Sequence, residues 1–141
     1  MSASDERLYF LLQTAAHLIK KRVDSDLVKS AGLTTAQAAV LTIIINEGGT
    51  NHTYLARILR QQKSAITTMA ERLEKAGYIT KQRSDKDRRS WELRVTEVGI
   101  AAYKKMRAPR DRLNAIVDET LKEKRVIAFA NDLRDLIKAF E

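Results

Sequence analysis

Two short stretches of the sequence concentrate side chains that can form hydrogen bonds and ion pairs. SDKDRRSWEL, from Ser84 to Leu93, holds six charged side chains in ten residues beside the single Trp of the chain, without any Gly or Pro. QKSAITT, from Gln62 to Thr68, offers an amide, an ammonium group and hydroxyls. Arg and Lys neutralise phosphates, whereas amides and hydroxyls can pair with base edges. The chemistry of both stretches suits a nucleic-acid partner, although a charged loop can also be a solvated surface.

No pattern in the sequence points to catalysis, to a cofactor or to a metal. The chain lacks phosphate-binding and dinucleotide-binding glycine loops and the H-E-x-x-H zinc pattern. It has no Cys, and its two His, His17 and His52, lie far apart in the sequence. The segment DKDR lacks the Gly and the distal Glu of a calcium loop. The sequence predicts a protein that is not an enzyme and that uses neither a cofactor nor a metal.

The distribution of charge raises the prospect of a polyanionic partner. The formal net charge is +8, and residues 51–97 supply eleven basic against six acidic side chains, while residues 1–50 are balanced. A length of 141 residues fits one domain with its own core. The N-terminus lacks the features of a signal peptide, and no apolar run approaches the length of a membrane span. We expect a cytoplasmic protein without membrane contact.

Helical periodicity and capping residues predict the elements that position the stretch from Gln62 to Thr68. Apolar residues repeat at helical spacing over residues 5–28. Thr34, with a Gln three residues later, begins a capping-box pattern for a helix that ends at EGG, and Asn51 is the expected N-cap of a short helix. The next helix starts near Gln62 and ends before Gly77. Two helices joined by the short RQQ segment form a helix-turn-helix pattern.

A β-hairpin is predicted to contain the charged stretch. WELRVT alternates apolar and polar residues from Trp91 onwards, which is typical of a half-buried strand, so Ser84–Arg89 form the hairpin loop. Trp91 is expected to anchor the base of the hairpin against the preceding helix. Thr96 is the expected cap of a further helix, in which Pro109 causes a kink or a split. A second capping box is predicted at Thr120.

Long helices flank this central unit, and each has an apolar stripe. The stripe of the last helix runs from Val126 to Phe140. Such faces need cover, which the central unit or a second copy of the chain can supply. The sequence favours the second copy, in a two-fold dimer.

The order of these segments also shows a family resemblance. LTTAQAAVL, LARILRQQKSAITTMAERLEKAGYI and RSDKDRRSWELRVTEVG follow one another as in the MarR family of bacterial regulators, which the chain resembles over Leu33–Gly99, about half its length. The D-x-D-R-R segment, with the strand and T-x-x-G that follow, is the specific part. The chain departs from the family at Arg60 and Gln61, where a Gly and an apolar residue are common, and at Gln62, where Asp is frequent.

The resemblance implies a mainly α fold with a small β-hairpin wing. A single MarR-like domain would span residues 1–141, with a winged helix-turn-helix DNA-binding unit at 33–97 and dimerisation helices at 5–32 and 98–141. It further implies a homodimer on a pseudo-palindromic operator of double-stranded DNA, acting as a repressor that a small-molecule effector releases. A winged-helix protein–protein module without specific DNA binding is the alternative.

The candidate site residues divide into three groups. DNA contacts are expected from the start of the second helix of the motif and from the hairpin: Gln62, Lys63, Ser64, Thr67, Thr68, Arg72, Arg83, Lys86, Arg88 and Arg89. Hairpin stabilisation is expected from Asp85, Asp87 and Trp91, since carboxylates can accept backbone N–H bonds in a turn without Gly. The resemblance implies effector contacts at His17, Tyr103 and Arg107, for which surface or interface packing is the alternative. Ser64 and Thr67 could instead satisfy local backbone groups.

Overall fold

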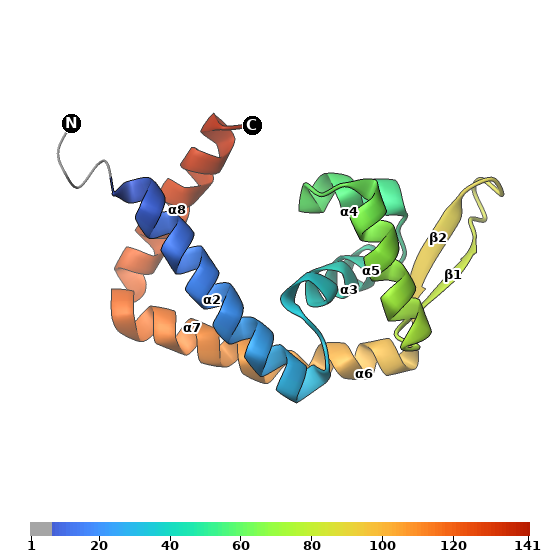
Figure 1. The fold of residues 1–141 in the computed structure, drawn as a ribbon, viewed down its shortest axis with the longest axis horizontal. Helices are drawn as coiled ribbons and strands as arrows, with labels where there is room; N and C mark the ends of the chain where they lie inside the picture. Colours follow the sequence, from blue (N-terminus) through green and yellow to red (C-terminus); the bar gives the residue numbers. More distant parts are fainter. Residues whose placement is uncertain (1–6) are drawn as a thin grey trace. The chain divides into compact units, whose positions relative to one another are not determined.

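The computed structural model describes residues 7–141, which form seven helices and one two-stranded sheet (Figure 1). The helices are α2 (Leu8–Ala31), α3 (Thr35–Glu47), α4 (His52–Leu59), α5 (Lys63–Lys75), α6 (Glu97–Lys105), α7 (Arg107–Leu121) and α8 (Glu123–Ala139), and the strands are β1 (Ile79–Arg83) and β2 (Trp91–Val95). The chain divides into an N-terminal unit that ends at Arg107 and a C-terminal unit from Ala108 to Glu141. The predicted mainly α fold with a hairpin wing is confirmed.

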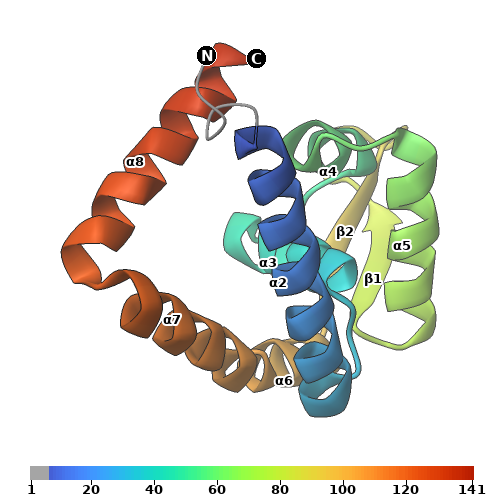
Figure 2. The ribbon, with the colours of Figure 1, turned by 60° about the vertical axis from the view of Figure 1, so that its left-hand side comes forward.

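The core of the N-terminal unit joins the helix-turn-helix to the hairpin. Side chains from α3, α4, α5 and both strands meet in one cluster, whose members with at most 2% exposure include Leu33, Val40, Leu41, Ile44, Leu55, Ile66, Leu73, Ile79 and Leu93. Burying each such side chain contributes roughly 1.5–3 kcal/mol. Figure 2 shows α5 lying alongside β1, and the two elements are in contact. The core therefore fixes the hairpin beside α5.

Local capping residues set the helix boundaries of the N-terminal unit. The hydroxyl of Thr34 accepts the N–H of Gln37 at 3.2 Å, and the Gln37 side chain accepts the N–H of Thr34 at 3.0 Å. Asn51 Oδ1 accepts the N–H of Tyr54 at 2.8 Å, and Thr96 caps α6 in the same manner. The three caps predicted from the sequence for α3, α4 and α6 are confirmed.

The register of the hairpin decides which of its side chains face the core. β1 and β2 pair antiparallel, with Lys81 opposite Leu93 and Arg83 opposite Trp91. Thr50, before α4, adds a bridge to Leu93 from the other side of β2. Residues opposite one another share a face of the sheet. Lys81, Arg83 and Trp91 thus lie on the face whose Leu93 is buried.

The long helix expected after Thr96 is split close to its proline. α6 ends at Lys105 and α7 begins at Arg107, so Pro109 falls in the first turn of α7. A proline in the first turn removes no helical hydrogen bond, since the N–H groups there have no partner within the helix. Of the two expected outcomes, a kink or a split, the chain shows the split.

The second predicted capping box is wrong. α7 continues as far as Leu121, so Thr120 lies inside a helix rather than before one. Its hydroxyl donates to the backbone oxygen of Ile116 at 2.7 Å, one turn earlier. Lys122, with φ of 67°, stands at the N-cap of α8 and gives no side-chain cap. The Ser/Thr-x-x-Glu pattern does not reveal by itself whether the preceding helix has ended.

Large apolar side chains remain at the surface of both units. Those of α2 are Leu8, Tyr9, Phe10, Leu11, Leu18, Ile19 and Val28, and those of the C-terminal unit are Ile116, Ile127, Phe129, Leu136, Ile137 and Phe140. Within residues 7–141, no single helix has both the length and the apolar character to cross a membrane, and α2 with α3 meets those criteria only as a pair bent by 66°.

Candidate nucleic-acid interface

The start of α5 presents polar side chains away from the core. Ile66 and Leu73 are at most 1% exposed, which turns the opposite face of the helix outward. Gln62, Lys63 and Ser64 at its N-terminus are exposed. The backbone of Gln62 has the extended conformation of an N-cap, but its side chain makes no capping hydrogen bond. The amide of Gln62 is therefore not used to begin the helix.

Two threonines on α5 direct their hydroxyl protons into the helix. The Thr67 hydroxyl donates to Lys63 O at 3.0 Å, and the Thr68 hydroxyl donates to Ser64 O at 3.1 Å. Thr67 is half-buried and Thr68 is exposed, as is Arg72 further along. The hydroxyl oxygens keep acceptor capacity, and each residue also has a methyl group. Such groups can accept from a base amino group or pack on a thymine methyl.

A groove at the turn between α4 and α5 gathers three cations. Its volume is about 610 Å³, and it is lined by Ala56, Arg57, Arg60, Gln61, Gln62, Lys63 and Ala65. Arg60 closes α4 in the left-handed region, at φ 52° and ψ 46°. The guanidinium of Arg57 lies 5.4 Å from the ring centroid of Tyr54. Arg57 is not among the residues predicted from the sequence to contact DNA. Its position in the last turn of α4, directly before the helix-turn-helix connection, could have indicated it.

Side-chain oxygens, rather than glycine, hold the hairpin loop. Asp87 Oδ1 accepts the N–H of Arg89 at 3.0 Å, and Asp87 Oδ2 accepts the hydroxyl of Ser90 at 3.4 Å. The Ser84 hydroxyl accepts the N–H groups of Lys86 at 3.2 Å and of Asp87 at 3.4 Å. A backbone bond from Ser84 N to Ser90 O, 3.0 Å long, closes the loop. Ser84 and Ser90 thus help to hold the loop. Neither is among the residues predicted from the sequence to stabilise the hairpin, although Ser is a common turn residue.

The two carboxylates of the loop, Asp85 and Asp87, form ion pairs with different arginines. Asp87 Oδ1 lies 3.5 Å from Nε of Arg89, whose side chain is 94% exposed. Asp85 lies instead 3.8 Å from Nη2 of Arg94 on β2. Exposed ion pairs contribute little to stability, so these two ion pairs act mainly on the orientation of the Arg89 and Arg94 side chains, while Asp87 also holds the loop backbone. The loop cations Lys86, Arg88 and Arg89 are all exposed.

Trp91 lies at the outer end of the hairpin, and its expected position at the base is wrong. It is opposite Arg83 in the last pair before the loop, and it is 38% exposed. The guanidinium carbon of Arg83 lies 3.9 Å from the indole centroid, and Nζ of Lys81 lies 4.7 Å from it. The register puts Leu93, rather than Trp91, over the core. Lys81 was also missed, although its spacing of two from Arg83 places both on one strand face.

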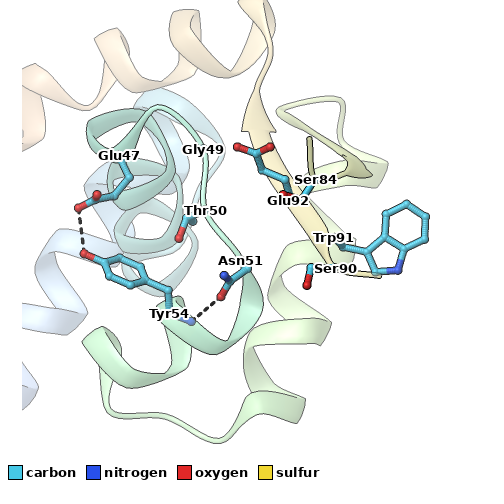
Figure 3. Close-up of a pocket in the computed structure, with 9 residues that line it drawn as sticks. All are labelled: Glu47, Gly49, Thr50, Asn51, Tyr54, Ser84, Ser90, Trp91 and Glu92. Atoms are coloured by element: carbon cyan, nitrogen blue, oxygen red, sulfur yellow. Dashed lines mark hydrogen bonds between the residues drawn. The ribbon is translucent and has the colours of Figure 1, made fainter. Parts of the chain in front are cut away.

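A polar pocket of about 240 Å³ lies between the α3–α4 connection and the hairpin (Figure 3). The Tyr54 hydroxyl donates to Glu47 Oε1 at 2.9 Å, and this bond raises the pKa of Tyr54. Figure 3 shows Glu92 and Trp91 on opposite sides of β2. A Cβ on Gly49 would collide with the Glu92 carboxylate, and Gly49 has φ of 126°. The glycine thus allows this connection to lie close against β2.

His52, at the start of α4, is half-buried near basic groups. Burial lowers its pKa, and the charges of Lys81 and Lys63 lower it further. Glu71 and Glu74 on α5 oppose that effect. Lys81 of β1 and Lys63 of α5 thus both disfavour the charged form of this imidazole.

The candidate effector residues do not meet in the cavities described above. His17 is exposed on α2, Tyr103 is half-buried against the core cluster, and Arg107 is exposed at the end of the N-terminal unit. None of the three lines the turn groove or the pocket beside the hairpin. Their role stays a prediction. Among residues 7–141, no group of three His, Asp or Glu residues is placed to hold a metal ion.

Comparison with known proteins finds similarity to transcriptional regulators. Residues 33–91 match the model of the MarR family. The HTH-type transcriptional repressor MdtR of Bacillus subtilis (strain 168) is 26% identical over 98% of this chain and 91% of its own length.

Solved structures share the fold. Sco3205, a MarR family transcriptional regulator from Streptomyces coelicolor in complex with DNA, superposes with a TM-score of 0.90 at 18% identity, over 100% of this chain and 94% of that one. CouR from Rhodococcus jostii RHA1, bound to p-coumaroyl-CoA, superposes with a TM-score of 0.83 at 23% identity, over 99% of this chain and 95% of that one. At these identities the likeness is one of fold.

Proposed function

The chain belongs to the MarR family of transcriptional regulators, and on that premise we propose that it is a homodimeric, sequence-specific DNA-binding repressor released by a small-molecule effector. One observation carries the proposal. The polar first turn of α5 and the cationic hairpin are both exposed, and the core holds them side by side. A helix N-terminus that projects beside a basic hairpin can engage adjacent grooves of a duplex.

Each part of the surface then has a distinct contact with DNA. Gln62, Ser64 and the two threonines at positions 67 and 68 would lie at base edges in the major groove, where amides, acceptors and methyl groups distinguish base pairs. Arg88 and Arg89 would reach the adjacent minor groove, whose negative potential attracts Arg. Phosphate contacts would come from Lys63, Arg72, Arg83 and Lys86, joined by Arg57, Arg60 and Lys81.

The exposed apolar stripes support a dimer of two-fold symmetry. α2 and the C-terminal unit present large apolar side chains that a single chain leaves open to water. A second copy would cover them, in keeping with assignment of 5–32 and 98–141 to dimerisation. The two copies of α5 would then be about 34–36 Å apart, one DNA turn, on a pseudo-palindromic operator.

Release by an effector is proposed from the relatives. CouR holds p-coumaroyl-CoA, which is a property of that protein. In this chain His17, Tyr103 and Arg107 are the candidate contacts. The effector can act only by favouring one of two arrangements of the DNA-binding units, because unequal affinity is what shifts an equilibrium. A cytoplasmic location, where DNA is accessible, follows from the same proposal.

A binding titration tests the proposal. A duplex selected from a randomised pool is compared with a shuffled duplex by fluorescence anisotropy at several salt concentrations. We expect a preference for the selected duplex and a steep loss of affinity with salt. Arg89→Ala should weaken the specific complex at least about tenfold, while Lys138→Ala, which removes a cation from the last turn of α8, should leave it unchanged. Equal, weak binding of both duplexes would instead favour the protein–protein module.

A further inference from the structure

The outer part of the hairpin places one indole against two cations. Arg83 and Trp91 face each other across the strands, and Lys81 precedes Arg83 by two residues on the same face. The distances to the indole centroid are 3.9 Å from the guanidinium carbon of Arg83 and 4.7 Å from Nζ of Lys81. Both lie well inside the range of about 6 Å over which a cation is attracted to an aromatic face.

Stacking leaves the hydrogen-bonding groups of these cations available. A guanidinium that lies on an aromatic face presents its N–H groups around its edge, in its own plane. A Lys ammonium has three donors, only part of which can face the ring. Each cation can therefore contact the indole and a phosphate at the same time. The indole also reduces the rotamer freedom that a long, exposed side chain would otherwise lose on binding.

The register of the hairpin places Lys81 and Arg83 on the strand face that packs toward α5. Lys81 and Arg83 follow Ile79 on the strand face that packs on the core, and β1 contacts α5. The opposite face carries Gln82 and Glu92. The two cations therefore lie on the side of the hairpin whose Ile79 and Leu93 pack with Ile66 and Leu73 of α5.

We propose that Trp91 is a positioning residue for DNA binding, whose indole holds Lys81 and Arg83 toward the phosphates between the grooves occupied by α5 and by the hairpin loop. This inference rests on the proposed function and assigns Trp91 a role of its own within it. Two other roles for the indole are distinguishable. A purely structural indole would support the whole hairpin, and a sequestering indole would hold the cations away from phosphate.

The test is a double-mutant cycle on DNA affinity. Trp91→Leu, Lys81→Ala/Arg83→Ala and the triple variant are titrated against a labelled duplex of about 30 base pairs selected with the wild-type chain, which spans two half-sites one turn apart. Trp91→Phe tests rescue by a weaker aromatic face, and Gln82→Ala on the opposite face is the matched control. Circular dichroism melting establishes that each variant is folded.

We expect Trp91→Leu to weaken binding about fivefold, and Trp91→Phe to recover part of that loss. Because Trp91→Leu keeps both charges, its slope of log affinity against log salt should stay close to that of the wild type. Removing the two cations should make the slope shallower by about one for each phosphate that the protein no longer neutralises. In the background without these cations, Trp91→Leu should have little further effect.

Three results would overturn the positioning role. An equal loss of affinity from Trp91→Leu with and without the cations would make the indole structural, and a gain in affinity would make it sequestering. Failure of Trp91→Phe to recover any binding would remove the aromatic face from the explanation. A wild-type chain that prefers no duplex would overturn the proposed function as well, whereas specific binding with an additive cycle would overturn the positioning role alone.

Discussion

The turn between α4 and α5 and the loop of the hairpin both bend without glycine, but they are held in different ways. At the turn, Arg60 adopts the left-handed conformation and Gln62 gives α5 no side-chain cap. In the hairpin loop, Ser84 and Asp87 accept hydrogen bonds from neighbouring backbone groups. One bend tolerates an unfavourable backbone conformation, and the other satisfies its backbone groups locally.

The packing of the flanking elements explains the difference. Residues 60–62 of the turn are exposed, but the helices on either side bury Leu55 and Ile66 fully, so the core fixes the two ends that the turn must connect. A non-glycine residue in the left-handed region costs roughly 1–2 kcal/mol, which a well-packed core can offset. In the hairpin loop, residues 85–90 are all exposed and Ser84 is half-buried. The order of the loop must therefore come from hydrogen bonds within it. Mutations in the loop should change the DNA affinity of the protein without an equal change in its stability.

The largest effect is expected where the core holds the turn. Ile66→Ala should lower the free energy of unfolding by about 2–5 kcal/mol, since it removes a fully buried side chain and leaves a cavity. Urea denaturation measures the change. Ser64→Ala, at an exposed position on the same helix, is the control and should change stability by at most about 0.5 kcal/mol. A decrease below about 1 kcal/mol for Ile66→Ala would mean that the turn does not depend on this packing.

Breaking the loop should affect binding more than stability. Asp87→Ala removes the acceptor of the Arg89 N–H and the carboxylate beside its guanidinium, so DNA affinity should fall by about tenfold, while the free energy of unfolding changes by about 1 kcal/mol or less. Anisotropy titration and urea denaturation measure the two effects. Asp85→Ala, whose carboxylate pairs with Arg94, is the matched control. Equal decreases of affinity from both changes would contradict the separate role of Asp87.

The conformation of Arg60 gives a third and smaller effect. Arg60→Gly should be more stable than Arg60→Ala by about 1 kcal/mol, because only glycine adopts a φ of 52° without strain. Both variants remove the same cation, so their comparison isolates the backbone contribution. Thermal and urea unfolding measure the difference. If the alanine variant is as stable as the glycine variant, the turn does not strain the chain.

The smallest effect concerns His52. Its folded-state pKa lies below its ordinary value of 6.5, because burial and the nearby Lys81 and Lys63 disfavour the charged form. Above both pKa values the imidazole is neutral in both states and stability is unaffected. As pH falls through about 6.5, the unfolded chain binds the proton first, so stability declines until the folded state is also protonated. Urea unfolding from about pH 8 to about pH 5.5 should show this decline, and His52→Gln should reduce it.

Local signals predicted the helix boundaries well where they acted through neighbours in sequence. The caps at Thr34, Asn51 and Thr96 bond to groups three residues ahead, so a short stretch of chain contains the whole interaction. The same reasoning failed at Thr120, because this residue lies inside α7, which had not yet ended. Its hydroxyl therefore donates to the backbone of the preceding turn instead of capping a new helix. Whether a cap forms depends on where the previous helix ends.

The mainly α fold, the helix-turn-helix and the hairpin could be predicted from the sequence, because periodicity, caps and turn residues act over a few positions. Which hairpin side chains are buried and which are exposed could not. Alternation shows that Trp91 and Leu93 lie on one strand face, but only the pairing of β1 with β2 and their packing on α5 show that Leu93 is buried while Trp91 lies against Lys81 and Arg83. Contacts between residues distant in the sequence depend on register and packing, which no short segment contains.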